Sequence, residues 1–100
     1  MNIVFLEPAR VEFFDAIEYY NSQSEGLGFE FSGEVQATIE RIVQYPEAWS
    51  PISKRTRRCR MKKFPYGVIY QVSGETILII AIMHLHRNPQ SWKARIPKWQ

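Results

Sequence analysis

Three basic side chains, Arg58, Arg60 and Lys62, alternate with Cys59 and Met61 in the run KRTRRCRMKKF. A period of two places alternate side chains on opposite faces of a strand, so the three bases share one face. Such a stripe can neutralise phosphates or carboxylates. The alternative is a solvated edge strand, on which Lys and Arg side chains prevent pairing with other sheets.

His84 and His86 end a long apolar run and are two residues apart, so they face the same way in a strand. A neutral imidazole can act as a general acid or base near neutral pH. The pair makes a poor metal site, because Glu75 is the one acid in residues 48–100 and no cluster of further ligands is present. The alternative is a structural hydrogen-bonding role for one histidine at the end of the strand.

Arg87 and Trp92 follow the histidines in the segment HLHRNPQSW. Arg87 is expected near the basic stripe if the preceding strands pair with one another. Trp92 either stacks on a base or a partner, or packs the tail onto the domain, and we favour packing. Cys59 is expected to face the core rather than to act as a nucleophile. The sequence has no Gly-rich phosphate loop and no serine in a nucleophile motif.

The elements that would position these residues have the order β-α-α-β-β-β. Residues 2–6 form a short apolar run, and residues 9–22 have helical spacing, with Glu12, Asp15 and Glu18 off the apolar stripe and expected in solvent. A second helical pattern ends at Tyr45-Pro46, and residues 46–56 are expected to be loop. Residues 58–62, 66–72 and 76–83 have strand patterns with short connections, which predicts an antiparallel meander. The two helices would cover one face, giving an α+β fold.

The chain has 100 residues, and its length and its hydrophobic fraction of 45% predict one globular domain over residues 1–100. It has no apolar run of membrane-spanning length, no signal peptide and a single cysteine, so we expect a cytoplasmic protein without membrane association. Residues 1–47 carry a net charge of −7 and residues 48–100 carry +10. This division predicts an acidic or polyanionic partner for the second half.

The chain resembles the ParE/RelE toxin family of bacterial type II toxin–antitoxin systems over nearly its whole length. The resemblance is carried by PARVEFFDAIEYY, GLGFEF and IVQYPEAW in the helical patterns, FPYGVIY at residues 64–70, and HLHRNPQSW at residues 84–92. The family fold is an antiparallel sheet with a helical hairpin on one face. The resemblance implies a cognate antitoxin as partner and no cofactor.

The resemblance implies one of two activities. RelE-like members cut messenger RNA on the ribosome without a metal, using basic residues on the sheet, whereas ParE-like members inhibit DNA gyrase. The candidate catalytic residues of a metal-independent endoribonuclease are Arg60, His84, His86 and Arg87. Gly67 stands where RelE-like members have an arginine, and their late catalytic tyrosine has no clear counterpart, with Trp92 near its place. The long helical hairpin and the HxxRxPxxW pattern are more similar to the ParE branch.

We therefore expect a ParE-like toxin that inhibits gyrase and is neutralised by an antitoxin with an acidic segment, and we favour a role without catalysis over that of a metal-independent endoribonuclease. The residues expected to bind the target or the antitoxin are Arg58, Arg60, Lys62 and Arg87. Two alternatives stay open on the sequence alone. One is a RelE-like, ribosome-dependent mRNA endonuclease, and the other is a non-toxic family member that only binds its antitoxin.

Overall fold

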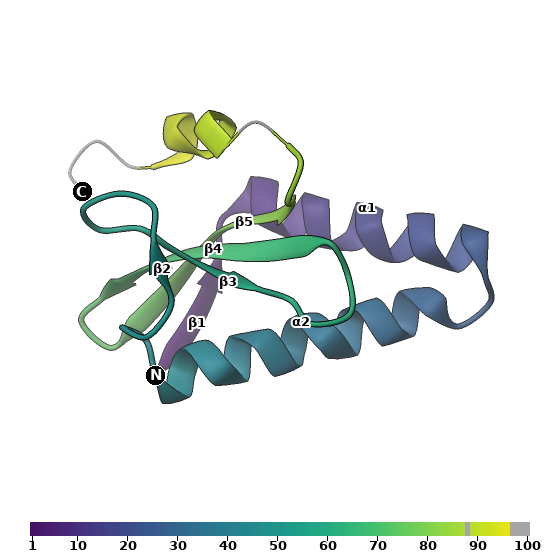
Figure 1. The fold of residues 1–100 in the computed structure, drawn as a ribbon, viewed down its shortest axis with the longest axis horizontal. Helices are drawn as coiled ribbons and strands as arrows, with labels where there is room; N and C mark the ends of the chain where they lie inside the picture. Colours follow the sequence, from purple (N-terminus) through teal and green to yellow (C-terminus); the bar gives the residue numbers. More distant parts are fainter. Residues whose placement is uncertain (88, 97–100) are drawn as a thin grey trace.

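The computed structural model describes residues 1–87 and 89–96, which form one sheet, two α-helices and a short 3-10 helix. The elements are β1 (Asn2–Phe5), α1 (Glu7–Gln23), α2 (Leu27–Gln44), β2 (Ser50–Pro51), β3 (Arg57–Arg60), β4 (Tyr66–Ser73), β5 (Thr76–His84) and η1 (Pro89–Arg95). This order confirms the predicted β-α-α-β-β-β arrangement, to which β2 and η1 are added (Figure 1).

The sheet has the strand order β1-β5-β4-β3-β2. β3, β4 and β5 form the predicted antiparallel meander, in which Val68 lies between Cys59 on one side and Ile82 on the other. β1 pairs in parallel with β5 at the opposite edge from β2. The prediction of an uninterrupted loop over residues 46–56 is wrong at β2, where Pro51 sits on the sheet edge, the position in which a strand tolerates proline.

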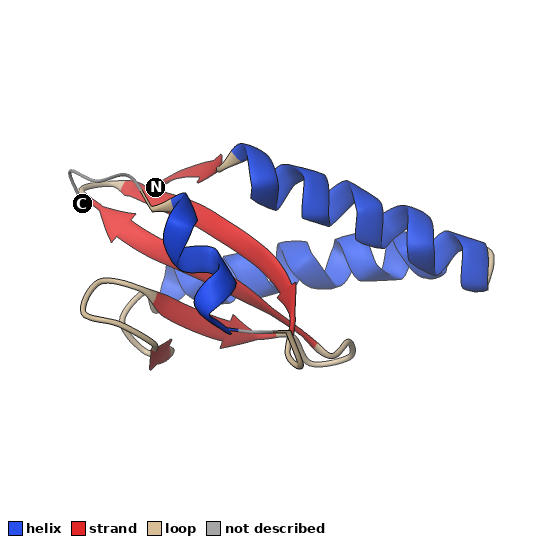
Figure 2. Cartoon of the chain, turned by 90° about the horizontal axis from the view of Figure 1, so that it is seen from above, coloured by secondary structure: helices blue, strands red, loops and turns tan. Residues whose placement is uncertain are grey.

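The two helices form a hairpin that covers one face of the sheet and extends beyond its end (Figure 2). Pro8 lies in the first turn of α1 and α2 ends before Tyr45, both as predicted. Gly28 is required where α2 begins to pack against α1, because a Cβ there would overlap the carbonyl oxygen of Ile17. In the part of the chain that the structure describes, no helix is both long enough and apolar enough to cross a bilayer.

The main hydrophobic core lies between this hairpin and the sheet. Phe31, Val35 and Ile42 of α2, which the helical spacing marks as one face, are fully buried there. Cys59 of β3 faces the same core, as predicted. Burial raises the pKa of the Cys59 thiol, so the reactive thiolate is disfavoured.

A second, smaller core lies on the opposite face, where η1 covers the sheet (Figure 1). Trp92 of η1 is 2% exposed and belongs to a cluster with Ile69, Ile80 and Met83. This burial confirms the predicted packing of the tail. Because η1 occupies part of this face, the basic residues of β3 lie beside a covered hydrophobic cluster rather than on an open sheet surface.

Candidate functional site

Arg58 of β3 lies across the neighbouring strand at Gly67. A Cβ built at Gly67 would come within 2.9 Å of Cγ and Cδ of Arg58, so the glycine makes room for the aliphatic part of the arginine. The Nε atom of Arg58 is buried and has no hydrogen-bond partner among the described residues. By strand alternation Arg58 and the exposed Arg60 share the face opposite Cys59, as predicted.

A small pocket beside Arg58 brings together three of the predicted site residues. This Arg58 pocket is lined by Ile52, Arg58, Ile69, Met83, His84, Leu85 and Arg87. Its polar groups come from β3, from the end of β5 and from the turn that follows. None of these described lining residues is acidic, so the arrangement suits a negatively charged group.

The two histidines lie side by side at the end of β5, with ring centroids 5.2 Å apart. The backbone N–H of His86 donates to Nδ1 of His84 at 3.1 Å. With Nδ1 as an acceptor, the neutral His84 ring carries its proton on Nε2 and is a hydrogen-bond donor there. To accept a proton on Nδ1, the ring would first have to give up the bond to His86. Within residues 1–87 and 89–96, no group of three or more His, Cys, Asp or Glu side chains is placed to hold a metal ion.

Arg87 turns towards Glu12 of α1, with 3.3 Å between Nη1 and Oε2. Glu12 also accepts two bonds from Arg95, at 2.7 and 2.8 Å, and one from the backbone N–H of Ile82 at 3.1 Å. The Glu12 side chain is 14% exposed, so the expectation that it lies in solvent is wrong. The reason is that β1 ends at Phe5 and leaves backbone groups of β5 without a strand partner, which Glu12 supplies.

Lys62 does not share the face of the other two bases. β3 ends at Arg60, and Lys62 lines a groove on the α2 side together with Arg41. Glu34 of α2 fixes this turn, because its Oε1 accepts from the backbone N–H of Lys62 at 2.8 Å and from that of the next residue at 3.2 Å. The predicted stripe therefore holds for Arg58 and Arg60 and is wrong for Lys62.

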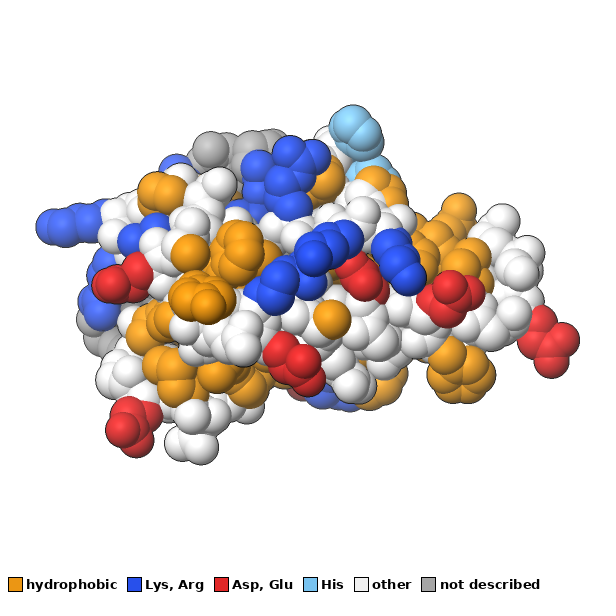
Figure 3. All heavy atoms as spheres, turned by 60° about the horizontal axis from the view of Figure 1, so that its bottom comes forward, with side chains coloured by type: hydrophobic (Ala, Val, Ile, Leu, Met, Phe, Trp, Pro, Cys, Tyr) orange, Lys and Arg blue, Asp and Glu red, His pale blue; other side chains and the backbone are white. Residues whose placement is uncertain are grey.

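Basic side chains also cross the face that α2 presents, beside hydrophobic ones (Figure 3). Arg41 of α2 is held there by bonds from Nη2 to Thr38 Oγ1 at 3.1 Å and to the carbonyl oxygen of Arg60 at 3.4 Å. Because Lys62 lies in the same groove as Arg41, the positive charge of residues 48–100 is divided between two sides of the molecule. The alternation of bases in the sequence predicts a single stripe instead.

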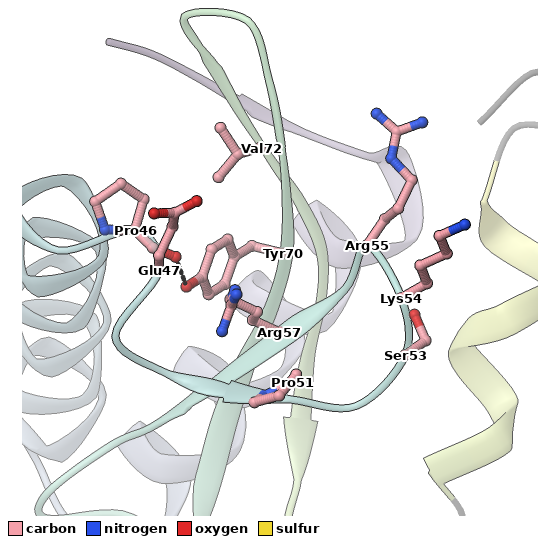
Figure 4. Close-up of a pocket in the computed structure, with 9 residues that line it drawn as sticks. All are labelled: Pro46, Glu47, Pro51, Ser53, Lys54, Arg55, Arg57, Tyr70 and Val72. Carbon is pink, nitrogen blue, oxygen red and sulfur yellow. Dashed lines mark hydrogen bonds between the residues drawn. The ribbon is translucent and has the colours of Figure 1, made fainter.

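A third pocket lies beside Tyr70, between the end of α2 and the segment that contains β2 (Figure 4). The Tyr70 hydroxyl donates to the carbonyl oxygen of Pro46 at 2.5 Å, and burial raises the pKa of Tyr70 to about 12. Arg57 lies next to this ring and donates to the carbonyl oxygen of Trp49 at 2.8 Å. Both bonds fasten the segment after α2 to the sheet.

Lys54 and Arg55 also line the Tyr70 pocket, but their side chains extend away from Tyr70 (Figure 4). Arg57 is therefore the one cation that reaches towards the ring among the described lining residues. The positive charges do not converge on this pocket, and we assign it a structural role. No sequence motif marks Arg57, because only its register with Tyr70 places it here.

The sequence matches the family model for the ParE toxin of the type II toxin–antitoxin system parDE over residues 3–89. It is 31% identical over 86 residues to Toxin ParE2 of two Mycobacterium tuberculosis strains, CDC 1551 / Oshkosh and ATCC 25618 / H37Rv. Each alignment covers 85% of this chain and 82% of the relative. The structure is similar to a chain of the chromosomal ParDE TA system from P. aeruginosa, with a TM-score of 0.62 and 14% identity. That similarity covers 84% of this chain and 95% of the other, and it shows a common fold.

Proposed function

The chain belongs to the ParE toxin family of type II toxin–antitoxin systems, and we propose that it inhibits DNA gyrase and is neutralised by a cognate antitoxin. The observation that carries the proposal is the family match over residues 3–89, which spans both helices, the whole meander and Arg87. Inhibition of gyrase is what the resemblance to the ParE branch implies. Because gyrase acts on DNA in the bacterial cytoplasm, the proposed place of action is the cytoplasm.

The surroundings of the candidate catalytic residues support an interaction with a target over cleavage of RNA. Attack by a 2′-hydroxyl on the neighbouring phosphate needs a proton acceptor, a proton donor and positive charge on the transition state. Arginines supply the charge but cannot accept the proton. His84, the candidate acceptor beside Arg58, has its Nδ1 engaged by the backbone of His86.

The position of Gly67 supports the same choice. RelE-like members have an arginine at the position that the resemblance assigns to Gly67. Here the stem of Arg58 fills the space that any side chain at position 67 would need. An arginine at position 67 and the observed position of Arg58 exclude each other, and β4 of this chain contains no arginine.

The charge distribution supports an antitoxin with an acidic, partly disordered segment. Residues 48–100 carry +10, and their bases lie both beside the Arg58 pocket and on the α2 side. A segment that folds as it binds can wrap such a divided surface, because it need not match one flat face. Arg58, Arg60 and Arg87 are the proposed contacts on one side, and Lys62 is the proposed contact on the other.

Induction of the protein in bacterial cells tests the proposal. We expect growth inhibition, altered DNA supercoiling and induction of the SOS response, all of which coexpression of the antitoxin reverses. Cleavage of messenger RNA within codons would contradict the proposal in favour of a ribosome-dependent nuclease. A stable antitoxin complex without any growth inhibition would contradict it in favour of a non-toxic family member.

A further inference from the structure

The buried Nε–H of Arg58 is a hydrogen-bond donor that the described part of the chain leaves unpaired. A buried donor without an acceptor costs free energy, and it is costlier on a charged group. Strand pairing fixes its position, because Arg58 stands opposite Ile69 and its stem lies over Gly67. The described part of the chain thus holds this arginine in place and supplies no acceptor for its Nε–H.

The hollow next to this arginine has a volume of about 20 Å³. That is room for one water-sized group. Its rim is otherwise apolar, with Ile52, Ile69, Met83 and Leu85 around the polar groups. A ligand that fits must present one small polar atom to Arg58 and apolar surface to the rim.

The charge of the hollow is positive. Arg87 is 53% exposed and its one ion-pair partner among the described residues is Glu12, which is shared with Arg95. His84 adds a donor at Nε2 without needing a charge, because its Nδ1 accepts from the backbone. Arg58, Arg87 and His84 all line the hollow, so the charged and polar side chains in its lining are two guanidinium groups and one imidazole.

A carboxylate meets these requirements better than a phosphodiester. It is planar and pairs with the edge of a guanidinium through two parallel hydrogen bonds, so a single oxygen has to enter the hollow. A nucleic acid would bring a row of phosphates, but Lys62 and Arg41 line a different groove on the α2 side. The apolar rim favours a carboxylate carried on a chain that also has apolar side chains.

We propose that the Arg58 pocket receives the carboxylate of one aspartate or glutamate of the antitoxin, flanked in that partner by an apolar side chain. This inference rests on the proposed function in that it takes the antitoxin as the partner. It goes further by naming Arg58, rather than Arg60 or Lys62, as the anchor of the complex.

The first test detects the arginine Nε–H signals of the full chain by ¹⁵N NMR during titration with N-acetylglutamate methylamide. The Arg58 signal is assigned by its loss in Arg58→Lys. We expect it to shift saturably in the millimolar range, while the signal of the exposed Arg60 changes little. Inorganic phosphate should bind more weakly at Arg58. Absence of a saturable shift, or tighter binding of phosphate than of the carboxylate, would overturn the proposal.

The second test uses Gly67→Ala, which keeps Arg58 but places a Cβ against its stem. We expect Gly67→Ala to lose the saturable shift and to weaken the antitoxin complex by about thirtyfold or more, the scale for losing a desolvated charge pair. Gly33→Ala is the matched control, because nothing lies within 4 Å of the site of its Cβ. Equal antitoxin affinity in both variants, with the native fold verified by circular dichroism, would contradict the anchoring role.

These outcomes are separate from the proposed function. Growth inhibition and supercoiling are measured without antitoxin, so a toxin that inhibits gyrase but shows no carboxylate binding at Arg58 would refute only the anchor. A protein that binds the carboxylate and the antitoxin but leaves gyrase active would refute only the proposed target.

Discussion

The carboxylate of Glu12 and the guanidinium of Arg95 form a two-bond ion pair, with N–O distances of 2.7 and 2.8 Å. The same arginine donates to the carbonyl oxygen of Ile80 at 3.1 Å, and the same carboxylate accepts from the N–H of Ile82. Hydrogen bonding to Glu12 raises the pKa of Arg95. The pair therefore connects α1, the free edge of β5 and the C-terminal helix in one network.

Glu12→Ala should lower the free energy of unfolding by about 3 kcal/mol or more, because it leaves a largely buried arginine and a strand N–H without an acceptor. Chemical unfolding of the purified variant measures this. Glu7→Ala is the control, since Glu7 and Arg10 form an ion pair that is mostly exposed, and its stability should match wild type. Equal effects of the two substitutions would show that the Glu12 network does not stabilise the fold.

Trp92→Ala should destabilise the protein by about 3–5 kcal/mol, the range for removing a large buried aromatic side chain. Thermal unfolding measures the loss, and Trp92→Phe should lose less because it keeps most of the apolar contact. The tail would then detach from Ile69 and Met83. Wild-type melting behaviour combined with lost toxicity would instead assign Trp92 to target contact.

Tyr70 should make the fold sensitive to alkaline pH. Its pKa is raised from 10.0 to about 12, so above pH 10 the unfolded chain loses a proton that the folded chain keeps. Stability should therefore be intact below pH 10 and fall between pH 10 and 12 by about 1.4 kcal/mol per pH unit. Denaturant unfolding across this range measures the slope. Tyr70→Phe should be less stable at neutral pH but should lose less stability than wild type on going to alkaline pH, and an identical slope in both proteins would contradict the assignment.

Gly67→Ala should destabilise the sheet by about 1–3 kcal/mol, the range for overpacking, because the new Cβ must displace the stem of Arg58. In an Arg58→Ala background the same change should cost less, and a double-mutant cycle measures the coupling. Gly33→Ala should instead stabilise α2 by about 0.5–1 kcal/mol, the difference in helix propensity. Additive effects of Gly67→Ala and Arg58→Ala would show that the two residues do not share this space.

Local periodicity was sufficient to predict the helices and strands whose buried residues recur at a regular spacing along the chain. Helical spacing identified Phe31, Val35 and Ile42, and a period of two placed Cys59 inside and Arg58 outside. These predictions succeeded because a buried stripe or face leaves its own pattern along the chain.

Long-range pairing left no such pattern. The helical pattern predicts that Glu12 lies in solvent, because it is off the apolar stripe. Only the early end of β1 leaves the backbone N–H of Ile82 free to donate to its carboxylate. Lys62 continues the period of two in the sequence. In the structure its backbone N–H donates to Glu34 of α2 instead of to a neighbouring strand, and β3 has already ended. The sequence contains only an indirect signal for Glu12. Its partners Arg87 and Arg95 lie in a C-terminal segment that has no acid of its own to pair with them.

The most direct test of the central claim combines purified protein, DNA gyrase and ribosome–mRNA complexes. We predict that the wild-type protein inhibits supercoiling by gyrase and cleaves no messenger RNA. Inhibition should persist in the His84→Ala, His86→Ala double variant and be weaker in the Arg58→Ala, Arg60→Ala double variant. Codon-specific cleavage of mRNA by the wild type that disappears in the double-histidine variant, together with unimpaired gyrase, would contradict the account.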